Sequence, residues 1–288
     1  MILVTAATGH IGPHLVQDLL ARGEQVRAMT RDAAKARAIP ALADAEIAVA
    51  DFLDPAALDR ALDGVRRVYW TTESHPLQLE HHAVFLAALQ RSNVELVVKN
   101  SVIAAEHAPE CAFCRWNREG ELLLLGSGLP WALVRPHQFV DNYRRNAAEI
   151  AQGRIYGARG AGRAAMIDVR DVAATAAAIV TGDGHEGRSY LVTGPTAFSA
   201  DEAAAAFADV LGWPVDAVDL GREGYWNLLR AKGIEPWFCT ALCDIERLWR
   251  DGYGDVVTTA VQDLTGRPPR ALRTWIEDNA DVFRAARG

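Results

Sequence analysis

The sequence predicts an α/β protein with a doubly wound parallel sheet and a smaller, mostly helical lobe toward its C-terminus. Three observations support this fold class. The chain opens with an apolar strand, a glycine turn and an amphipathic helix. Strand and helix patterns then alternate up to about residue 134, which is typical of a parallel sheet covered on both faces. Beyond residue 146 the pattern changes to a glycine-rich stretch, followed by alanine-rich helices with clustered aromatic residues.

The first βαβ unit is the clearest local signal. An apolar strand at 2–5 precedes the turn, and residues 11–22 repeat apolar side chains at the spacing of a buried helical face. Gly23 is placed to end that helix, because glycine readily adopts the left-handed conformation after a last turn. A second strand follows at 26–31.

The later elements continue the alternation. We expect strands at 46–50, 65–70, 94–99 and 131–134, with helices at 55–62, 79–91 and 116–125. Residues 166–172 precede a helix that returns to the sheet, and 189–193 form its last strand. We therefore predict a nucleotide-binding Rossmann domain at 1–146, completed by about 166–195. Residues 147–165, expected as loop, and 196–288 form the substrate lobe.

Composition excludes several classes of partner. The formal net charge is -7 and basic residues are dispersed, which argues against nucleic-acid binding. No 18-residue apolar run is present, so we expect no membrane span. The N-terminus passes directly into a strand without a signal sequence, and we expect a cytoplasmic protein.

Four cysteines form two close pairs, Cys111 with Cys114 and Cys239 with Cys243. A zinc site or a redox-active Cys111/Cys114 pair are alternatives, but two unconnected pairs of thiols fit better. Cys239 and Cys243 are expected to share the buried face of a helix. We expect no metal.

The glycine turn indicates a nicotinamide dinucleotide. Backbone amides at a helix N-terminus bind phosphate groups, and glycine allows the ligand to approach them closely. Arg31 ends the second strand and Lys35 lies one helical turn beyond, which favours the 2′-phosphate of NADP(H). Asp32 is a competitor, because a shift of one residue would present a carboxylate to the ribose of NAD.

The chain resembles the NmrA-like branch of the atypical short-chain dehydrogenase/reductase superfamily over nearly its whole length. The matching segments are 2–12, 26–32, 50–54, 127–131 leading into 133–136, 167–171, 184–187 with Tyr190, 193–195, 264–269 and 275–283. This resemblance implies the following cofactor contacts. The pyrophosphate is held by Thr8, Gly9, His10, Ile11 and Gly12. The 2′-phosphate lies beside Arg31 and Lys35, and the adenine is flanked by Asp51 and Phe52. The ribose and nicotinamide are bordered by Thr71 and Thr72.

Two departures from the family pattern matter. Ala6 replaces the first glycine of the turn, which strains the loop by about 1 kcal/mol if the residue has positive φ and costs little otherwise. The Tyr-x-x-x-Lys pair of the wider superfamily falls at Phe113 and Asn117. Neither side chain can supply the proton or the charge of that pair. Ser101 does match the family's serine.

Catalytic candidates are therefore His137, Ser101 and Tyr143, with His137 favoured because it follows a strand at its carboxyl end. We expect an NADPH-dependent reductase of a small aromatic or conjugated substrate, since such acceptors need little help from a protein acid. Two alternatives stay open: an NADP(H)-binding redox sensor without turnover, and a non-redox biosynthetic enzyme such as a cyclase, isomerase or lyase. A small molecule is the expected partner, and a homodimer is allowed. The residues Tyr225, Trp226, Trp237 and Phe238 are candidate pocket walls.

Overall fold

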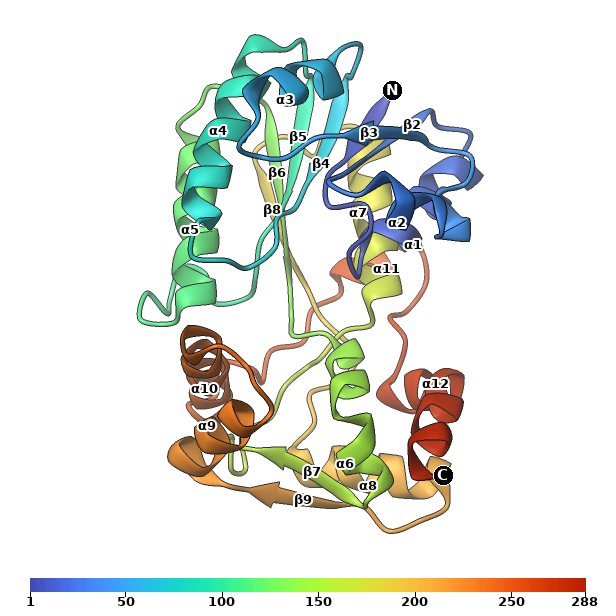
Figure 1. Cartoon of the computed structure of the whole chain (residues 1–288), viewed down its shortest axis with the longest axis vertical. Coiled ribbons are helices and arrows are strands. Elements are labelled where there is room, and N and C mark those ends of the chain that lie inside the picture. Colours follow the sequence, from blue (N-terminus) through green and yellow to red (C-terminus); the bar gives the residue numbers. More distant parts are fainter.

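A central sheet of seven parallel strands forms the upper half of the molecule in the computed structural model, which describes all 288 residues (Figure 1). The strand order is β3-β2-β1-β4-β5-β6-β8. The bounds are β1 (Ile2–Val4), β2 (Val26–Thr30), β3 (Glu46–Val49), β4 (Arg67–Trp70), β5 (Leu96–Asn100), β6 (Trp131–Pro136) and β8 (Arg188–Val192). The predicted doubly wound sheet is confirmed. Strand order reverses between β1 and β4, and ligands of such sheets bind outside the carboxyl ends at this point.

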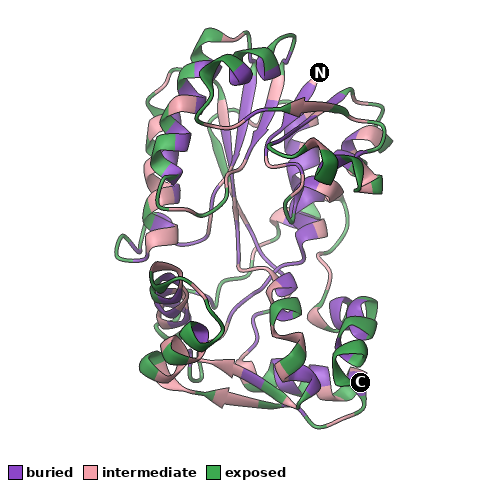
Figure 2. Cartoon of the chain, viewed as in Figure 1, coloured by how far each residue is buried: buried purple, intermediate pink, exposed green.

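Helices cover both faces of the sheet. One face packs on α1 (Gly12–Ala21), α7 (Val169–Thr181) and α11 (Ala260–Thr265), and the other on α3 (Pro55–Leu62), α4 (Gln78–Arg91) and α5 (Ala112–Leu125). Short α2 (Ala33–Arg37) and the 3₁₀ turn η1 (Pro40–Leu42) connect β2 to β3. Figure 2 shows the strands as largely buried between these layers.

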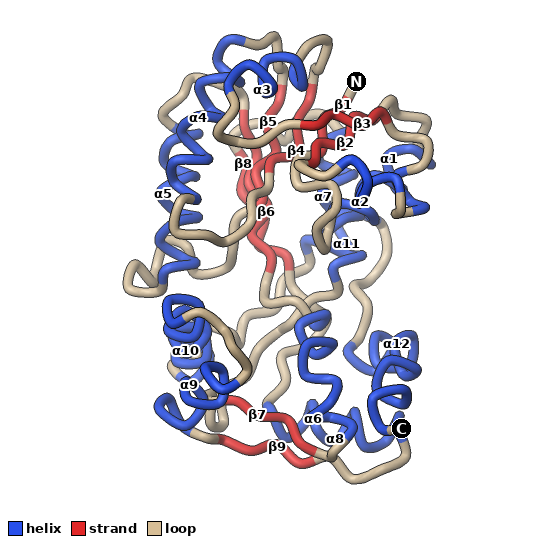
Figure 3. The backbone as a smooth tube through the Cα atoms, viewed as in Figure 1, coloured by secondary structure: helices blue, strands red, loops and turns tan.

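The second half of the molecule is the lobe, and Figure 3 shows loops running into it from the sheet. It contains η2 (Val140–Asn146), α6 (Ala147–Ala151), β7 (Arg154–Gly157), α8 (Ala200–Leu211), β9 (Asp216–Asp219), α9 (Gly221–Ala231), α10 (Pro236–Arg250) and α12 (Leu272–Arg287). A separate core of 23 buried residues holds the lobe together, centred on large aromatic side chains such as Trp249, Trp275 and Phe207. Its size allows the lobe to pack as a unit beside the sheet.

The expectation that 147–165 is loop was wrong. This stretch contains α6 and β7, and β7 pairs in parallel with β9, more than 55 residues later. Gly153, at φ +81°, makes the turn between α6 and β7. Each element is only four or five residues long, and the strand depends on a distant partner, so local periodicity could not reveal either one.

Side-chain caps explain several helix boundaries. The carboxylate of Asp54 accepts from the amide of Ala57, and α3 begins at Pro55 as predicted. A capping box between Ser199 and Glu202 starts α8. No helix in the structure has the length and apolar character that crossing a membrane requires.

Candidate functional site

The glycine turn after β1 forms a close-fitting cradle. A Cβ atom at Gly12 would lie 2.3 Å from the carbonyl oxygen of Ala7, and one at Gly9 would lie 3.1 Å from that of Ala6. Glycine at position 12 therefore lets α1 pack against the turn. No side chain caps the N-terminus of α1, so its first amides are available to an anion. The turn fits a dinucleotide pyrophosphate.

Ala6 has φ +46°, the left-handed region that favours glycine. The sequence left open whether Ala6 strains the turn, and the positive φ shows that it does. The cost is about 1 kcal/mol for a single alanine. The turn nevertheless closes, because the Gly9 amide donates to the Ala6 carbonyl at 2.9 Å.

The residues after β2 favour NADP(H). Asp32 caps α2: its carboxylate accepts from the amides of Ala34 and Lys35 at 2.9 and 3.0 Å. The carboxylate that competed with Arg31 in the sequence is thus engaged by a helix end. Arg31 is exposed and its guanidinium lies 3.2 Å from Glu73, which follows β4. Sequence reasoning missed Glu73 because the pairing joins two separate strand ends.

The other predicted cofactor residues lie along the same edge of the sheet. Asp51 accepts from the amide of Leu53 at 2.8 Å, which fixes the turn that carries Phe52. Thr71 exchanges two hydrogen bonds with the Thr5 hydroxyl, at 2.7 and 2.8 Å. The Thr72 hydroxyl lies 3.0 Å from Nε2 of His82. The hydroxyl of Thr5, which was not predicted as a cofactor residue, thus joins the carboxyl end of β1 to the backbone of Thr71 after β4.

As polar residues on a helix, His81 and His82 would be expected at the surface, and this expectation is wrong. Both are buried on the inner face of α4. The His81 ring stacks on Phe52 at 5.8 Å, and burial lowers the pKa of His82. The sequence does not show which face of the helix carries these histidines, because histidine occurs both on exposed and on buried helix faces.

Arg145 is a further residue that the sequence did not indicate. It lies in η2 of the lobe, and its guanidinium is 3.3 Å from Nε2 of His10 in the glycine turn. Burial and then the charge of Arg145 lower the pKa of His10. Its neighbour Arg144 is held instead by Asn279 and lies over the ring of Trp275. Arg145 therefore places a positive charge from the lobe at the predicted pyrophosphate position.

The three catalytic candidates are not brought together around one cavity. Ser101 follows β5 and is fully buried, and its hydroxyl has no partner. His137 stacks on Trp249, with Nε2 3.1 Å from the Gly254 carbonyl and Nδ1 accepting from the Gln138 amide. Burial lowers the pKa of His137 to about 3. Both ring nitrogens of His137 are thus engaged in the lobe, and its catalytic role stays a prediction.

Tyr143 lies in the lobe core. It is buried against Phe207 and Trp275, and burial raises its pKa. Phe113 and Asn117, at the Tyr-x-x-x-Lys positions, both lie on α5, which begins at Ala112 rather than at 116 as expected. Asn117 donates to the Phe113 carbonyl at 2.9 Å, so its amide is used within the helix.

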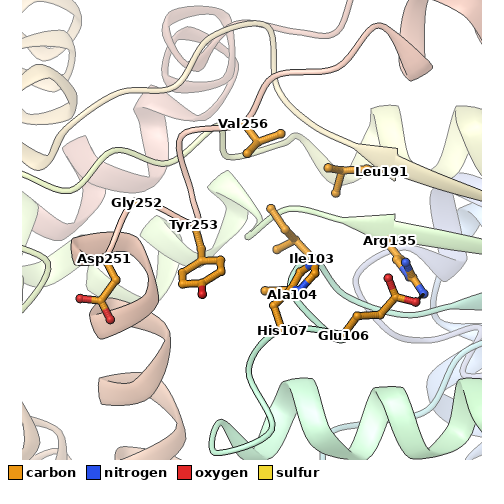
Figure 4. A pocket seen from close by; sticks show the side chains of 11 residues that line it. Ile103, Ala104, Glu106, His107, Arg135, Leu191, Asp251, Gly252, Tyr253 and Val256 are labelled. Carbon is orange, nitrogen blue, oxygen red and sulfur yellow. Dashed lines mark hydrogen bonds and ion pairs between the residues drawn. The ribbon is translucent and has the colours of Figure 1, made fainter.

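A cavity of about 500 Å³ opens between the carboxyl ends of β5, β6 and β8 and a lobe loop. Figure 4 shows Tyr253 of that loop opposite the segment that follows β5. The lining residues are Ile103, Ala104, Ala105, Glu106, His107, Arg135, Leu191, Asp251, Gly252, Tyr253 and Val256. The volume is in the range of small-molecule sites, and six lining residues are hydrophobic.

Polar groups at the cavity are few and defined. Arg135 donates to Glu106 at 3.0 Å, and this contact lowers the pKa of the Glu106 carboxyl. The rings of His107 and Tyr253 stack at 6.4 Å. Ala104 has φ +61°, and strained backbone of this kind is concentrated at functional sites.

The expected aromatic walls lie elsewhere. Trp237 and Phe238 pack on Phe113, while Tyr225 and Trp226 cover a small cluster with Cys239 and Cys243. These two cysteines do share the buried face of α10, as predicted. No group of three or more His, Cys, Asp or Glu side chains could hold a metal ion. A second hollow of about 660 Å³ is lined by residues of β8, of the loop before it, and of α11 with the residues that lead into it.

Comparison with known proteins agrees with this geometry. A model of the NAD(P)H-binding family matches residues 6–183. The chain is 38% identical to a (4-alkanoyl-5-oxo-2,5-dihydrofuran-3-yl)methyl phosphate reductase of Streptomyces griseus, covering 98% of this chain and 99% of that protein. It is 33% identical to an NAD(P)H azoreductase of Xenophilus azovorans, over 99% and 100% of the two chains.

A solved structure is similar throughout. The NADPH complex of an NADPH-dependent quinone oxidoreductase from Escherichia coli superposes with a TM-score of 0.89, covering 97% of this chain and 100% of that one at 26% identity.

Proposed function

Because this chain belongs to the NAD(P)H-binding family, in its NmrA-like, atypical short-chain dehydrogenase/reductase branch, we propose that it is an NADPH-dependent reductase of a small aromatic or conjugated acceptor. The observation that carries this is the pairing of a dinucleotide cradle with a 500 Å³ apolar cavity at the carboxyl ends of one sheet. The named relatives act on a dihydrofuranone phosphate, an azo compound and a quinone. Each is an acceptor whose double bond is conjugated.

The absence of the Tyr-x-x-x-Lys pair supports the same class of acceptor. Bound NADPH would supply the hydride. Reduction of an isolated ketone leaves an alkoxide that needs a strong proton donor, and Phe113 and Asn117 cannot provide one. Hydride addition to a quinone, an enone or an aromatic azo bond leaves a delocalised anion that solvent or a weak acid can protonate. An imine would react as its iminium, which hydride converts directly to a neutral amine.

We assign the cofactor contacts as follows. The amides of residues 8–12 and the guanidinium of Arg145 hold the pyrophosphate. Arg31 and Lys35 hold the 2′-phosphate, with Arg31 leaving Glu73 to do so. Thr71 and Thr72 hold the nicotinamide ribose, and Asp51 and Phe52 border the adenine. Arg31 pairs with Glu73 only at the surface, where such pairs contribute little, so the exchange costs little.

The substrate would lie in the cavity between Ile103 and Tyr253. Ser101 starts the segment that lines this cavity, so of the three candidates it lies nearest along the chain to the proposed substrate position, and we assign it the proton-transfer role. His137 and Tyr143 would act by fixing the lobe loop and η2, because their polar atoms face the lobe interior.

The proposal also covers domain roles, location in the cell and oligomeric state. We propose that residues 1–146 with 166–195 form the cofactor domain and the remaining residues the substrate lobe, and that the protein acts in the cytoplasm. We also propose a homodimer, because Leu122 and Leu125 of α5 are 52% and 38% exposed. Light scattering of the purified protein would test the dimer, with a monomer mass overturning it.

The test of function has two parts. Calorimetric titration with NADPH and NADH should show micromolar binding of NADPH and much weaker binding of NADH. Turnover with quinones, azo dyes and enones should then consume NADPH, while simple aliphatic ketones should not. Tight NADPH binding without oxidation by any acceptor would instead support the redox sensor.

A further inference from the structure

Lys99 is a buried lysine near the carboxyl end of β5. Its side chain is fully buried, and no carboxylate lies within ion-pair distance of its ammonium group. Nζ donates to the Asn100 carbonyl at 3.3 Å and lies 4.9 Å from the centre of the Trp70 ring. Lysine is almost never fully buried without a charged partner, so this position calls for an explanation.

The residues around Lys99 belong to the cofactor and substrate ends of the sheet. Trp70, its neighbour on β4, precedes Thr71 and Thr72. Side chains alternate along a strand, so Ser101 points to the same face as Lys99. Of the six buried polar atoms without a hydrogen-bond partner, five belong to the end of β4, to the buried side of α4 or to the residue after β5: Trp70 Nε1, Gln78 Oε1, His81 Nδ1, His82 Nδ1 and Ser101 Oγ.

The charged groups that face Lys99 do not neutralise it. From α4, burial lowers the pKa of His82, so its ring is uncharged at neutral pH. From α5 comes Glu121, but Arg135 binds both of its oxygens at 2.7 and 2.8 Å and Arg118 adds a contact at 2.9 Å. The Lys99 charge is therefore in excess on this face.

Helix α5 leaves room for this arrangement. A Cβ at Gly120 would lie 2.1 Å from Nδ1 of His82 and 3.0 Å from Cε of Lys99. Gly120 is three residues beyond Asn117, where the superfamily pattern places its lysine. The helix thus has no cation at position 117, and it has a glycine beside the end of the Lys99 side chain.

We propose that Lys99 is a positioning residue that supplies, from strand β5, the positive charge which α5 lacks at Asn117, and that its field favours negative charge on the acceptor in the cavity. This rests on the proposed reductase function. Electrostatic groups fixed in a low-dielectric interior act strongly on charge that develops during a reaction. The same field disfavours the positively charged ring of oxidised nicotinamide relative to the neutral reduced ring.

The chemistry of lysine suits this role. The chain has 30 basic residues, of which only three are lysines. Arginine stays charged at every pH, whereas a buried lysine can lose its proton. Burial lowers the pKa of Lys99 to about 8, an effect that Glu121 partly opposes. The charge is therefore present at neutral pH and is lost as the pH rises above about 8.

The first experiment compares cofactor preference in wild type and Lys99→Met by calorimetry. We expect the ratio of the NADP⁺ to the NADPH dissociation constant to fall about tenfold in the variant. In the wild type the same ratio should fall as the pH rises through about 8. This second measurement needs no variant, so it also tests the proposal if Lys99→Met does not fold. A ratio independent of both the substitution and pH overturns the proposal.

The second experiment separates this role from a merely structural one. An uncompensated buried charge costs stability, so Lys99→Met without cofactor should melt at a higher temperature than the wild type at pH 7. The gap should narrow between pH 8 and about pH 10, where folded Lys99 is uncharged but unfolded lysine still binds its proton. Turnover should fall about 10- to 100-fold. Lys232→Met, which removes an ion pair with Glu149 in the lobe, is the control: it should leave turnover unchanged and should not raise the melting temperature.

The outcomes also distinguish this proposal from the proposed function. The wild type could bind NADPH and reduce quinones while Lys99→Met shows the same NADP⁺/NADPH affinity ratio, the same pH dependence of that ratio and the same turnover rate. In that case the lysine proposal fails and the proposed function stands. If the wild type binds no dinucleotide, the function fails and the lysine proposal fails with it.

Discussion

At the scale of single residues, Ala6 shows that the turn accepts strain to keep its shape. Its φ of +46° lies where glycine is favoured, yet the turn still closes on Gly9. The sequence identified the position and the condition on which strain depends. The sign of φ follows from how the turn folds back on Gly9, which a sequence does not show.

Ala6→Gly should therefore increase the free energy of unfolding by up to about 1 kcal/mol. Ala7→Gly is the matched control: Ala7 has negative φ and is fully buried, so its loss should destabilise the protein. Denaturant unfolding without cofactor measures both. Equal destabilisation by the two substitutions would show that Ala6 is unstrained.

The ion pair between Glu73 and Arg31 leads to the second prediction for single residues. In the proposed cofactor complex Glu73 would compete with the 2′-phosphate for Arg31, so Glu73→Gln should tighten NADPH binding about threefold and leave NADH binding unchanged. Glu95→Gln, which breaks the exposed Arg66 pair at the other end of the sheet, should affect neither cofactor. An equal gain for NADH would place Glu73 away from the 2′-phosphate.

At the scale of elements, η2 links the lobe to the cofactor turn through Arg145. The pyrophosphate is common to NADPH and NADH, so Arg145→Gln should weaken both about tenfold. Arg31→Gln should weaken NADPH alone. Titration of the two variants with both cofactors gives four values that follow this pattern. If Arg145→Gln weakened the binding of NADPH but not of NADH, Arg145 would not contact the pyrophosphate.

The elements also show what a sequence can reveal. Strong periodicity and caps predicted α1, α3 and all seven strands of the sheet, to within a few residues. The missed pieces, α6, β7 and β9, are short and depend on partners distant in the chain. In the site, the glycine turn carries its own local signal. Arg145, Tyr253 and Lys99 do not, because their surroundings come from contacts between segments far apart in sequence.

At the scale of the whole molecule, we propose that the sheet holds the cofactor and that the lobe closes the substrate cavity. Tyr253 belongs to the lobe loop and stacks on His107. Tyr253→Ala should raise the KM for a quinone several-fold while the Kd for NADPH stays the same. Parallel kinetics and titration test this division. Weaker NADPH binding with an unchanged KM for the quinone would instead show that Tyr253 contacts the cofactor and not the substrate.

The central claim is that hydride passes from NADPH to a conjugated acceptor in this cleft. The most direct measurement is a single-turnover reaction in which enzyme loaded with NADPH is mixed with a quinone and the absorbance of reduced nicotinamide is followed. We predict stoichiometric oxidation of NADPH with formation of the hydroquinone, slowed by deuterium at the transferred position of the cofactor. Stable NADPH absorbance in the presence of every conjugated acceptor tested would contradict the claim.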